Sequence, residues 1–278
     1  MGLIRRREGV NRLFKKVYGI DTGMHTGAEN MACDRNLMQA FLDGSFRSIL
    51  GDDACLWRFY GWHPFAVSLG YNQSMADIDS VRCYDAGVDI VRRPTGGRAV
   101  FHADEFTYSF FAETTRANEV IYRYVHEVIM HALDMLDVKA DFCRSTPEPL
   151  KQGGVAAVSC FAASAKYELQ VNGRKLVGSA QRRTRNVLLQ HGSMPFSIRH
   201  RELSNFLSSC ESGFALDVCD ALQKKAVSLG EILETVPEYG VMVQCMRQAS
   251  ATSGGASMTM LDPLQFERFF RNQEPFIH

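Results

Sequence analysis

Apolar residues recur along the chain with the spacing of helices in some segments and of strands in others. Between Val120 and Leu136 they return at one- and three-residue steps, which predicts an amphipathic helix with one buried face. A second helix is predicted over residues 30–43, because its apolar residues are near-helical in spacing and Gly44 follows. Further helices are expected over residues 77–86, 201–209 and 217–234.

Aromatic and β-branched runs separated by turn residues predict strands. Residues 56–62 and 64–73 are such runs, and we expect them to pair as a hairpin. Residues 167–178 form a second hairpin, because Asn172-Gly173 suits the positive-φ positions of a type I′ turn. The remaining runs are 88–94, 106–113 and 186–196. Strands in hairpins without regular βαβ alternation predict an α+β domain on a largely antiparallel sheet flanked by helices.

The stretch from residue 141 to residue 158 lacks periodicity and is rich in Pro, Gly, Ser and Ala. It is expected to be a long loop, and loops of that length in compact domains are usually functional or mobile.

Charge and hydropathy exclude several classes of protein. The 31 Lys and Arg residues balance 31 Asp and Glu residues, which argues against a nucleic-acid or membrane-surface partner. The basic N-terminus lacks the apolar core of a signal peptide, and no stretch reaches the roughly 18 apolar residues of a membrane span. We therefore expect a cytoplasmic protein. The eight cysteines show no CxxC or Cys/His cluster, so no metal site is expected.

Basic residues and glycines lie together in Arg92-Arg93-Pro94-Thr95-Gly96-Gly97-Arg98, with His102 four residues further on. Paired glycines let a backbone approach a ligand closely, and amides beside arginines suit a phosphate or an acyl carbonyl. The same residues are equally consistent with a tight turn that binds no ligand. The segment is not a P-loop, because GxxxxGK[ST] is absent.

Cys160 ends the long irregular segment, and Lys175 follows fifteen residues later on the second arm of the Asn-Gly hairpin. A cysteine nucleophile must ionise, and a nearby ammonium lowers the pKa of its thiol. The residues alone leave two interpretations open, since most cysteines are structural and most turn lysines are solvated.

Three segments together resemble a known family: RRPTGGRAVFH, the TYS of the strand at 106–113, and CFAASAKYELQVNGRKLVGSAQRRTRNVLLQHGSM. They are similar to the biotin/lipoate protein ligase superfamily and, more narrowly, to its cysteine-dependent octanoyltransferases. The resemblance implies that superfamily's α+β catalytic fold, which we expect over residues 29–235. An N-terminal arm (1–28) and a C-terminal tail (236–278) packed on or extending the domain would flank it.

The resemblance also implies an activity and its residues. Cys160 would carry an octanoyl thioester and Lys175 would depress its pKa. Arg93, Thr95, Gly96, Gly97, Arg98 and His102 would line the substrate site. Octanoyl-acyl carrier protein would be the donor, and the acceptor a lysine of a lipoyl domain such as glycine cleavage H protein. No cofactor is needed because the donor is itself a thioester, and a monomer is expected.

Three rival activities stay open. The first is an ATP-dependent lipoate-protein ligase, against which Cys160 and Arg98 argue. The second moves octanoyl from one lipoyl carrier to another. The third is a non-enzymatic module that docks acyl carriers. The arginines of 182–185, with Arg92, Arg93 and Arg98, could attract an acidic carrier or could be a solvated face.

Overall fold

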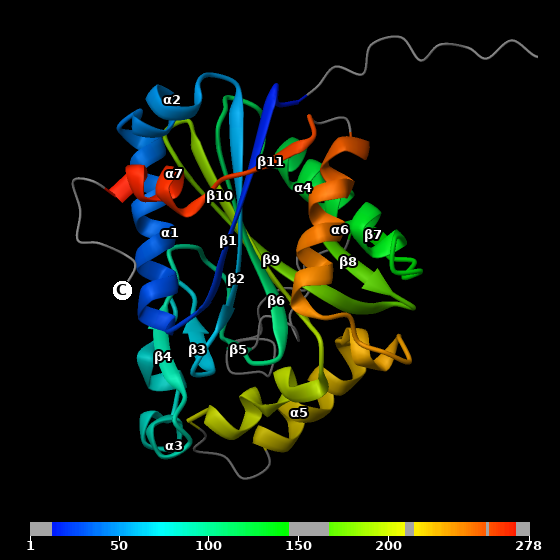
Figure 1. The fold of residues 1–278 in the computed structure, drawn as a ribbon. Coiled ribbons are helices and arrows are strands. Elements are labelled where there is room, and N and C mark those ends of the chain that lie inside the picture. Colours follow the sequence, from blue (N-terminus) through cyan, green and yellow to red (C-terminus); the bar gives the residue numbers. More distant parts are fainter. Residues whose placement is uncertain (1–12, 145–166, 209–213, 254–255, 271–278) are drawn as a thin grey trace, which may run out of the picture.

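The computed structural model describes residues 13–144, 167–208, 214–253 and 256–270 (Figure 1). Within these residues the chain forms one large mixed sheet covered by helices on both faces, with a smaller sheet at one end. The order of strands in the large sheet, with their bounds, is β11 (Met258–Met260), β1 (Lys16–His25), β2 (Ala54–Trp62), β6 (Glu105–Glu113), β10 (Val187–Pro195), β9 (Arg174–Thr184), β8 (Tyr167–Val171) and β7 (Asp141–Arg144).

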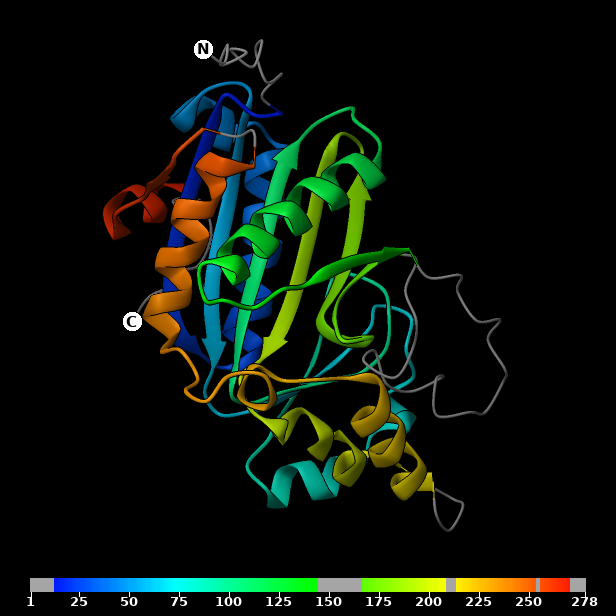
Figure 2. The same cartoon turned by 90° about the vertical axis from the view of Figure 1, so that its right-hand side faces the viewer.

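Two groups of helices cover the two faces of the large sheet. One face carries α1 (Gly27–Leu42), α2 (Ser45–Leu50) and α7 (Pro263–Glu267) with the short 3₁₀ helix η5 (Arg268–Phe270). The other face carries α4 (Asn118–Asp134) and α6 (Tyr239–Thr252), which lie side by side in front of the strands in Figure 2. A capping box between Thr26 and Glu29 starts α1, so the helix begins at a defined residue next to the end of β1.

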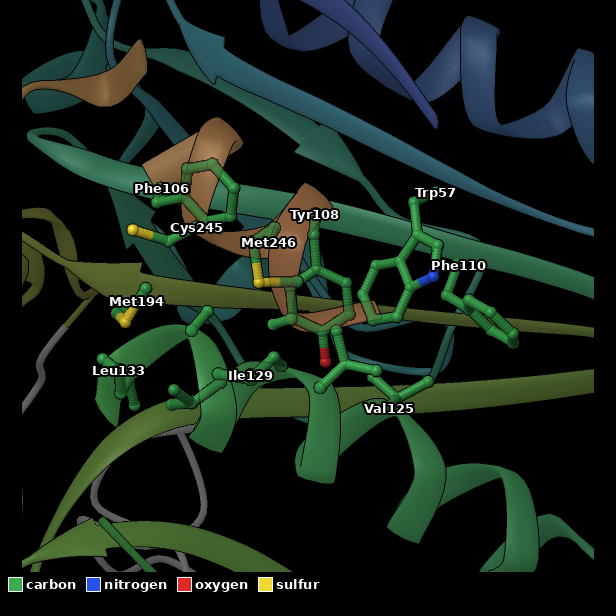
Figure 3. Close-up of a cluster of buried hydrophobic side chains, with 14 of the residues drawn as sticks. Trp57, Phe106, Tyr108, Phe110, Val125, Ile129, Leu133, Met194, Cys245 and Met246 are labelled. Carbon is green, nitrogen blue, oxygen red and sulfur yellow. The ribbon is translucent and has the colours of Figure 1, made fainter. Parts of the chain in front are cut away.

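The alternation of side chains along β2 and β6 explains why the two faces differ. Trp57, Tyr108 and Phe110 point to the same face and pack against α4 and α6 in one apolar cluster (Figure 3). The intervening positions point toward α1: Leu56 and Phe111 are apolar, whereas Arg58 and Ser109 are polar although buried. The α1 side of the sheet therefore changes along its length from an apolar core to a buried polar network.

The small sheet joins the large one at the end where this polar network lies. Its strand order is β4 (Asp89–Arg92), β3 (Ala66–Leu69) and β5 (Val100–His102). Around it pack η1 (Met75–Asp77), α3 (Ser80–Asp85), η3 (Ile198–Phe206) and α5 (Phe214–Lys225). The short 3₁₀ helix η4 (Leu229–Glu231) buries Leu229 in the apolar cluster that contains residues of α4 and α6.

Several predicted elements are confirmed. The strong amphipathic pattern becomes α4, with Val125, Ile129 and Leu133 buried. The Asn172-Gly173 turn joins β8 to β9, and both residues have positive φ, 51° and 75°. Five of the seven neighbouring strand pairs in the described part of the large sheet are antiparallel, as the α+β prediction requires.

Three expectations were wrong. Residues 56–62 and 64–73 do not form a hairpin: β2 pairs with β1 and β6 of the large sheet, whereas β3 pairs with β4 and β5 of the small one. Residues 141–144, expected to start a loop, form β7. Residues 16–25, assigned to an N-terminal arm, form β1, because Val17 and Ile20 are buried on the two faces of the sheet.

Candidate functional site

The glycine loop between β4 and β5 is held in shape by the guanidinium of Arg93. The Arg93 side chain is buried, and its Nη2 donates to the carbonyl oxygens of Gly96 and Arg98 at 2.9 and 2.7 Å. Its Nη1 donates to the carbonyl oxygen and the hydroxyl of Ser68 on β3, at 3.0 and 3.2 Å. The backbone between these anchors passes through a left-handed conformation at Gly97, with φ 92°. Arg93 thus organises the loop from inside.

Two further contacts fix the outer side of this loop. A methyl group added at Gly70 would lie 1.9 Å from the carbonyl oxygen of Gly97, so the two backbones touch where no side chain fits. Arg182 reaches across from β9, donates to the carbonyl oxygen of Pro94 at 2.9 Å and lies 4.7 Å above the ring of Tyr71. The loop is therefore clamped between both sheets.

A pocket opens where the small sheet meets the large one, with about 390 Å³ of empty space including the part open to solvent. Apolar and polar side chains both line it: Met31, Tyr60, Trp62, Val100, Ser68, Arg93, His102, Thr107, Ser179, His191 and Ser193, together with Gly178, Ala180 and Gly192. Met31, Tyr60 and Trp62 form one apolar cluster, which suits an acyl chain.

His102 sits in a short chain of hydrogen bonds inside this pocket. Its Nδ1 lies 2.6 Å from the buried carboxylate of Glu105, and its Nε2 lies 2.7 Å from the hydroxyl of Ser68. Because an ionised carboxylate can only accept, Nδ1 carries a proton, and when the ring is neutral Nε2 accepts from Ser68. The indole of Trp62 stacks on the imidazole with a 4.0 Å centroid distance, and Thr107 donates to Glu105 at 2.6 Å.

Burial of Glu105 favours its neutral form, but the charge and hydrogen bond of His102 and the hydroxyls of Ser193 and Thr107 outweigh burial and hold its pKa below the usual value. Glu105 is therefore a carboxylate whose position is fixed from three sides.

A second chain of the same kind runs through His191. Its Nδ1 lies 3.4 Å from the carboxylate of Asp34 on α1, and its Nε2 lies 2.5 Å from the hydroxyl of Thr95 in the glycine loop. Burial lowers the pKa of His191, and Asp34 offsets part of that effect. Asp34 also accepts from Arg58 at 2.8 Å and from Ser109 at 2.7 Å. The loop is thereby connected to the buried polar network under α1.

Lys175 lies on β9, three residues before the stretch of that strand that lines the pocket. It is 3% exposed, and its Nζ donates to Glu168 on β8 at 2.9 Å. Gln170 donates to the other oxygen of the same carboxylate at 3.2 Å. A buried ammonium is screened less than a solvated one, and the Glu168 carboxylate offsets part of the charge of this one.

The structure brings together most of the residues that the sequence singled out. Arg93 and His102 line the pocket, Thr95 contacts the lining residue His191, and Lys175 lies on a strand that supplies part of the wall. Gly96, Gly97 and Arg98 form the loop that Arg93 holds. Cys160 lies outside the described residues.

The arginines at 182–185 are divided between two places. Arg182 holds the glycine loop, whereas Arg183 donates to Asn118 and to backbone carbonyls in the turn before α4. Neighbouring residues of a strand point to opposite faces, so this basic run is not one continuous patch.

Sequence reasoning missed four residues of the site: Asp34, Ser68, Glu105 and His191. A pattern was present, because polar residues alternate with aromatic ones in EFTYSFF at 105–111. Buried strands rarely carry polar residues at every second position unless those residues bond one another.

The sequence profile of the lipoyl protein ligase A/B catalytic domain matches residues 26–250. The chain belongs to this family. The lipoyl protein ligase A/B catalytic domain thus includes the glycine loop, the pocket, Lys175 and most of α6.

Curated relatives of this family member include proteins named octanoyltransferase LipM. One from Symbiobacterium thermophilum is 41% identical over 64% of this chain and 65% of its own length. One from Clostridioides difficile is 36% identical over 61% of this chain, and the match spans 62% of that protein, so both are matched over less than two thirds of their length. One from Bacillus subtilis is 32% identical over 77% of this chain and 78% of its own.

Solved structures show the same fold. A bipartite lipoate protein ligase from Thermoplasma acidophilum superposes with a TM-score of 0.68 at 14% identity, over 92% of this chain and 91% of that one. A lipoate-protein ligase A solved with ATP gives 0.65 at 15% identity, over 92% of each chain.

No group of His, Cys, Asp and Glu among the described residues of this lipoyl protein ligase A/B domain could hold a metal ion. Over the same part of the chain, none of the helices combines the length and the hydrophobicity needed to cross a bilayer.

Proposed function

We propose that this protein is an octanoyl-[acyl-carrier-protein]:protein N-octanoyltransferase of lipoate biosynthesis. Cys160 takes the octanoyl group from octanoyl-acyl carrier protein as a thioester and passes it to a lysine of a lipoyl domain, such as glycine cleavage H protein. The protein acts as a cytoplasmic monomer without a cofactor. The names of the curated relatives support this choice within the family.

The observation that carries the proposal is the buried lysine on the strand that supplies part of the pocket wall. Lys175 is held by Glu168 on a strand that also supplies Gly178, Ser179 and Ala180 to the pocket wall. An ammonium in that position lowers the pKa of a neighbouring thiol and favours the thiolate as nucleophile and as leaving group. Exchange between two thioesters is nearly balanced in free energy, so the first transfer needs no ATP. The final amide is strongly favoured.

Arg93, Thr95, Gly96, Gly97, Arg98 and His102 bind the acyl donor in this proposal. The apolar cluster of Met31, Tyr60 and Trp62 would receive the alkyl chain. Loop amides and Lys175 would stabilise the oxyanion that forms in each transfer. Arg92 and Arg182 beside the loop would attract an acidic carrier, so added salt should slow the reaction with the carrier.

Intact mass spectrometry after incubation with octanoyl-acyl carrier protein, without ATP, tests the proposal. We expect an octanoyl adduct that hydroxylamine removes and that Cys160→Ala lacks. Octanoyl-lipoyl carrier offered as donor in a parallel reaction tests the carrier-to-carrier alternative. If no adduct forms from either donor, and the lipoyl domain is modified only with ATP and free octanoate, the chain is a ligase and the proposal is wrong.

A further inference from the structure

The amide-forming half of the proposed reaction poses a proton-transfer problem. A lysine side chain is protonated near neutral pH, with an ordinary pKa of about 10.4, and an ammonium cannot attack a thioester. Some group must accept its proton. Lys175 is already the cation that would stabilise the thiolate, so it is poorly suited to this second role.

Three side chains in the pocket have the geometry of a proton relay. Ser68 and His102 both line the pocket, and their Oγ and Nε2 atoms are 2.7 Å apart. Glu105 holds Nδ1 on the far side of the same ring at 2.6 Å. A hydroxyl, an imidazole and a carboxylate in this order are the arrangement by which a base is oriented and its protonated form stabilised.

We propose that His102, oriented by Glu105 and linked to the pocket by Ser68, accepts the proton that the acceptor lysine loses before it attacks the acyl-enzyme. This inference rests on the proposed octanoyltransferase function. Ser68 and His102 are catalytic residues in this scheme, and Glu105 is a positioning residue.

Proton transfer from the acceptor ammonium precedes transfer of the acyl group. An N–H bond of the acceptor ammonium breaks, its proton binds the Ser68 oxygen, and the Ser68 proton moves to Nε2 of His102. The neutral amine then attacks the thioester carbon, a C–N bond forms, and the C–S bond breaks with its electron pair on sulfur. The second proton of the attacking nitrogen goes to that sulfur. The imidazolium, paired with Glu105, returns its proton to water.

The charges around His102 favour this direction of transfer. Arg93 donates to the Ser68 hydroxyl at 3.2 Å, so a second cation at the same hydroxyl is disfavoured and the neutral amine is preferred. The other titratable groups that face the relay are His191 on β10 and His200 on η3, with Asp34 and Arg58 behind His191. Glu105 is the carboxylate in direct contact with the ring, and its negative charge stabilises the imidazolium.

Single-turnover transfer from preformed acyl-enzyme to the lipoyl domain, measured against pH, tests the relay. For the wild type we expect a rate of transfer that depends less on pH than the rates of the relay variants. His102→Gln should slow transfer by about 10²- to 10⁴-fold. Its rate should continue to rise toward the lysine pKa of about 10.4. Ser68→Ala should behave likewise and Ser68→Thr should retain transfer, whereas Glu105→Gln should show a smaller loss.

Adduct formation, the reaction step before transfer, distinguishes a failure of the relay from a failure of the proposed function. In every relay variant, adduct formation from octanoyl-acyl carrier protein should be slowed much less than transfer, because the relay acts on the acceptor amine, whereas loss of a donor-site contact slows both steps alike. Added imidazole should restore transfer to His102→Ala, a gain that a purely structural role would not give. His131→Gln is the matched control, because His131 lies on α4 and bonds Glu127 and Ser253 instead of pocket residues.

Two results would overturn the relay and leave the octanoyltransferase function intact. One is an unchanged rate and pH profile of transfer in His102→Gln. The other is equal slowing of adduct formation and transfer, without imidazole rescue. A wild-type protein that forms no adduct would instead refute the proposed function.

Discussion

Replacement of Arg58 by Met should be among the most destabilising single changes in this protein. Arg58 and Asp34 are both fully buried, 2.8 Å apart, so the variant leaves a carboxylate in the interior without its cation. It also removes donors to Asn30 and Thr22 and the cation that lies 3.9 Å from the ring of Tyr60.

The expected loss is about 3–5 kcal/mol at pH 7.5, the usual cost of breaking a buried ion pair by removing one partner. Because domains are stable by only about 5–15 kcal/mol, this is a large share of the total. The midpoint of thermal unfolding should fall by roughly 6–20 °C.

The pH dependence of this loss gives a second check. In the wild type, burial favours protonated Asp34, but the His191 hydrogen bond and the Arg58 charge outweigh it and hold the pKa low. The carboxylate then stabilises the fold above its unfolded pKa of about 3.9, and the effect fades only as pH falls below that value. Without Arg58 the pKa of Asp34 rises, so the deficit of the variant should shrink as pH falls from 8 to 5.

Guanidinium unfolding at both pH values measures the free energy of unfolding. The double variant Asp34→Asn/Arg58→Met is the control, and its loss should be smaller than the sum of the two single losses. A deficit of Arg58→Met below about 1 kcal/mol, or additive losses in the double variant, would refute the electrostatic reasoning.

Two further predictions concern the edges of the site. Gly70→Ala should lower the free energy of unfolding by about 1–3 kcal/mol and displace the glycine loop, because its methyl group would meet the backbone of Gly97. Gly96→Ala should lower it far less, since no atom lies within 4 Å of the added methyl group. Equal unfolding midpoints of the two variants would contradict this reasoning. Burial disfavours ionised Glu231, but hydrogen bonds from Arg201 and Ser228 lower its pKa to about 2. Its stabilisation should therefore fade as pH falls from about 4.5 toward 2. Glu231→Gln should lose about 0.5–1 kcal/mol at pH 7, because solvent screens these charges, and should flatten that acid slope.

Local patterns in the sequence predicted where helices, strands and turns lie more reliably than which strands pair with each other. The periodicity of α4 and the Asn172-Gly173 turn depend on residues close in the chain, and both were confirmed. The strands at 56–62 and 64–73 were recognised, but their pairing depends on strands from distant parts of the chain. Strands adjacent in sequence pair about two times in three, and this pair is one of the exceptions.

Prediction of the site residues is limited in the same way, because contacts between residues distant in the sequence are not visible in it. Arg93, Thr95 and His102 could be singled out because they stand close together in the sequence. Asp34 could not, because an aspartate within an amphipathic helix is ordinarily solvated, and its partner Arg58 comes 24 positions later on a strand. Only the fold shows that the two charges neutralise each other.

The pairing of β1 with β11 also has a consequence for synthesis. Among the described strands β1 leaves the ribosome first; β2 covers one of its edges, but the other edge waits for residues 258–260. At about 5–20 residues per second the edge stays open for roughly 10 to 50 s. An exposed strand edge during that time is a template for pairing with other nascent chains. Truncation before residue 256 should make that state permanent and yield aggregates.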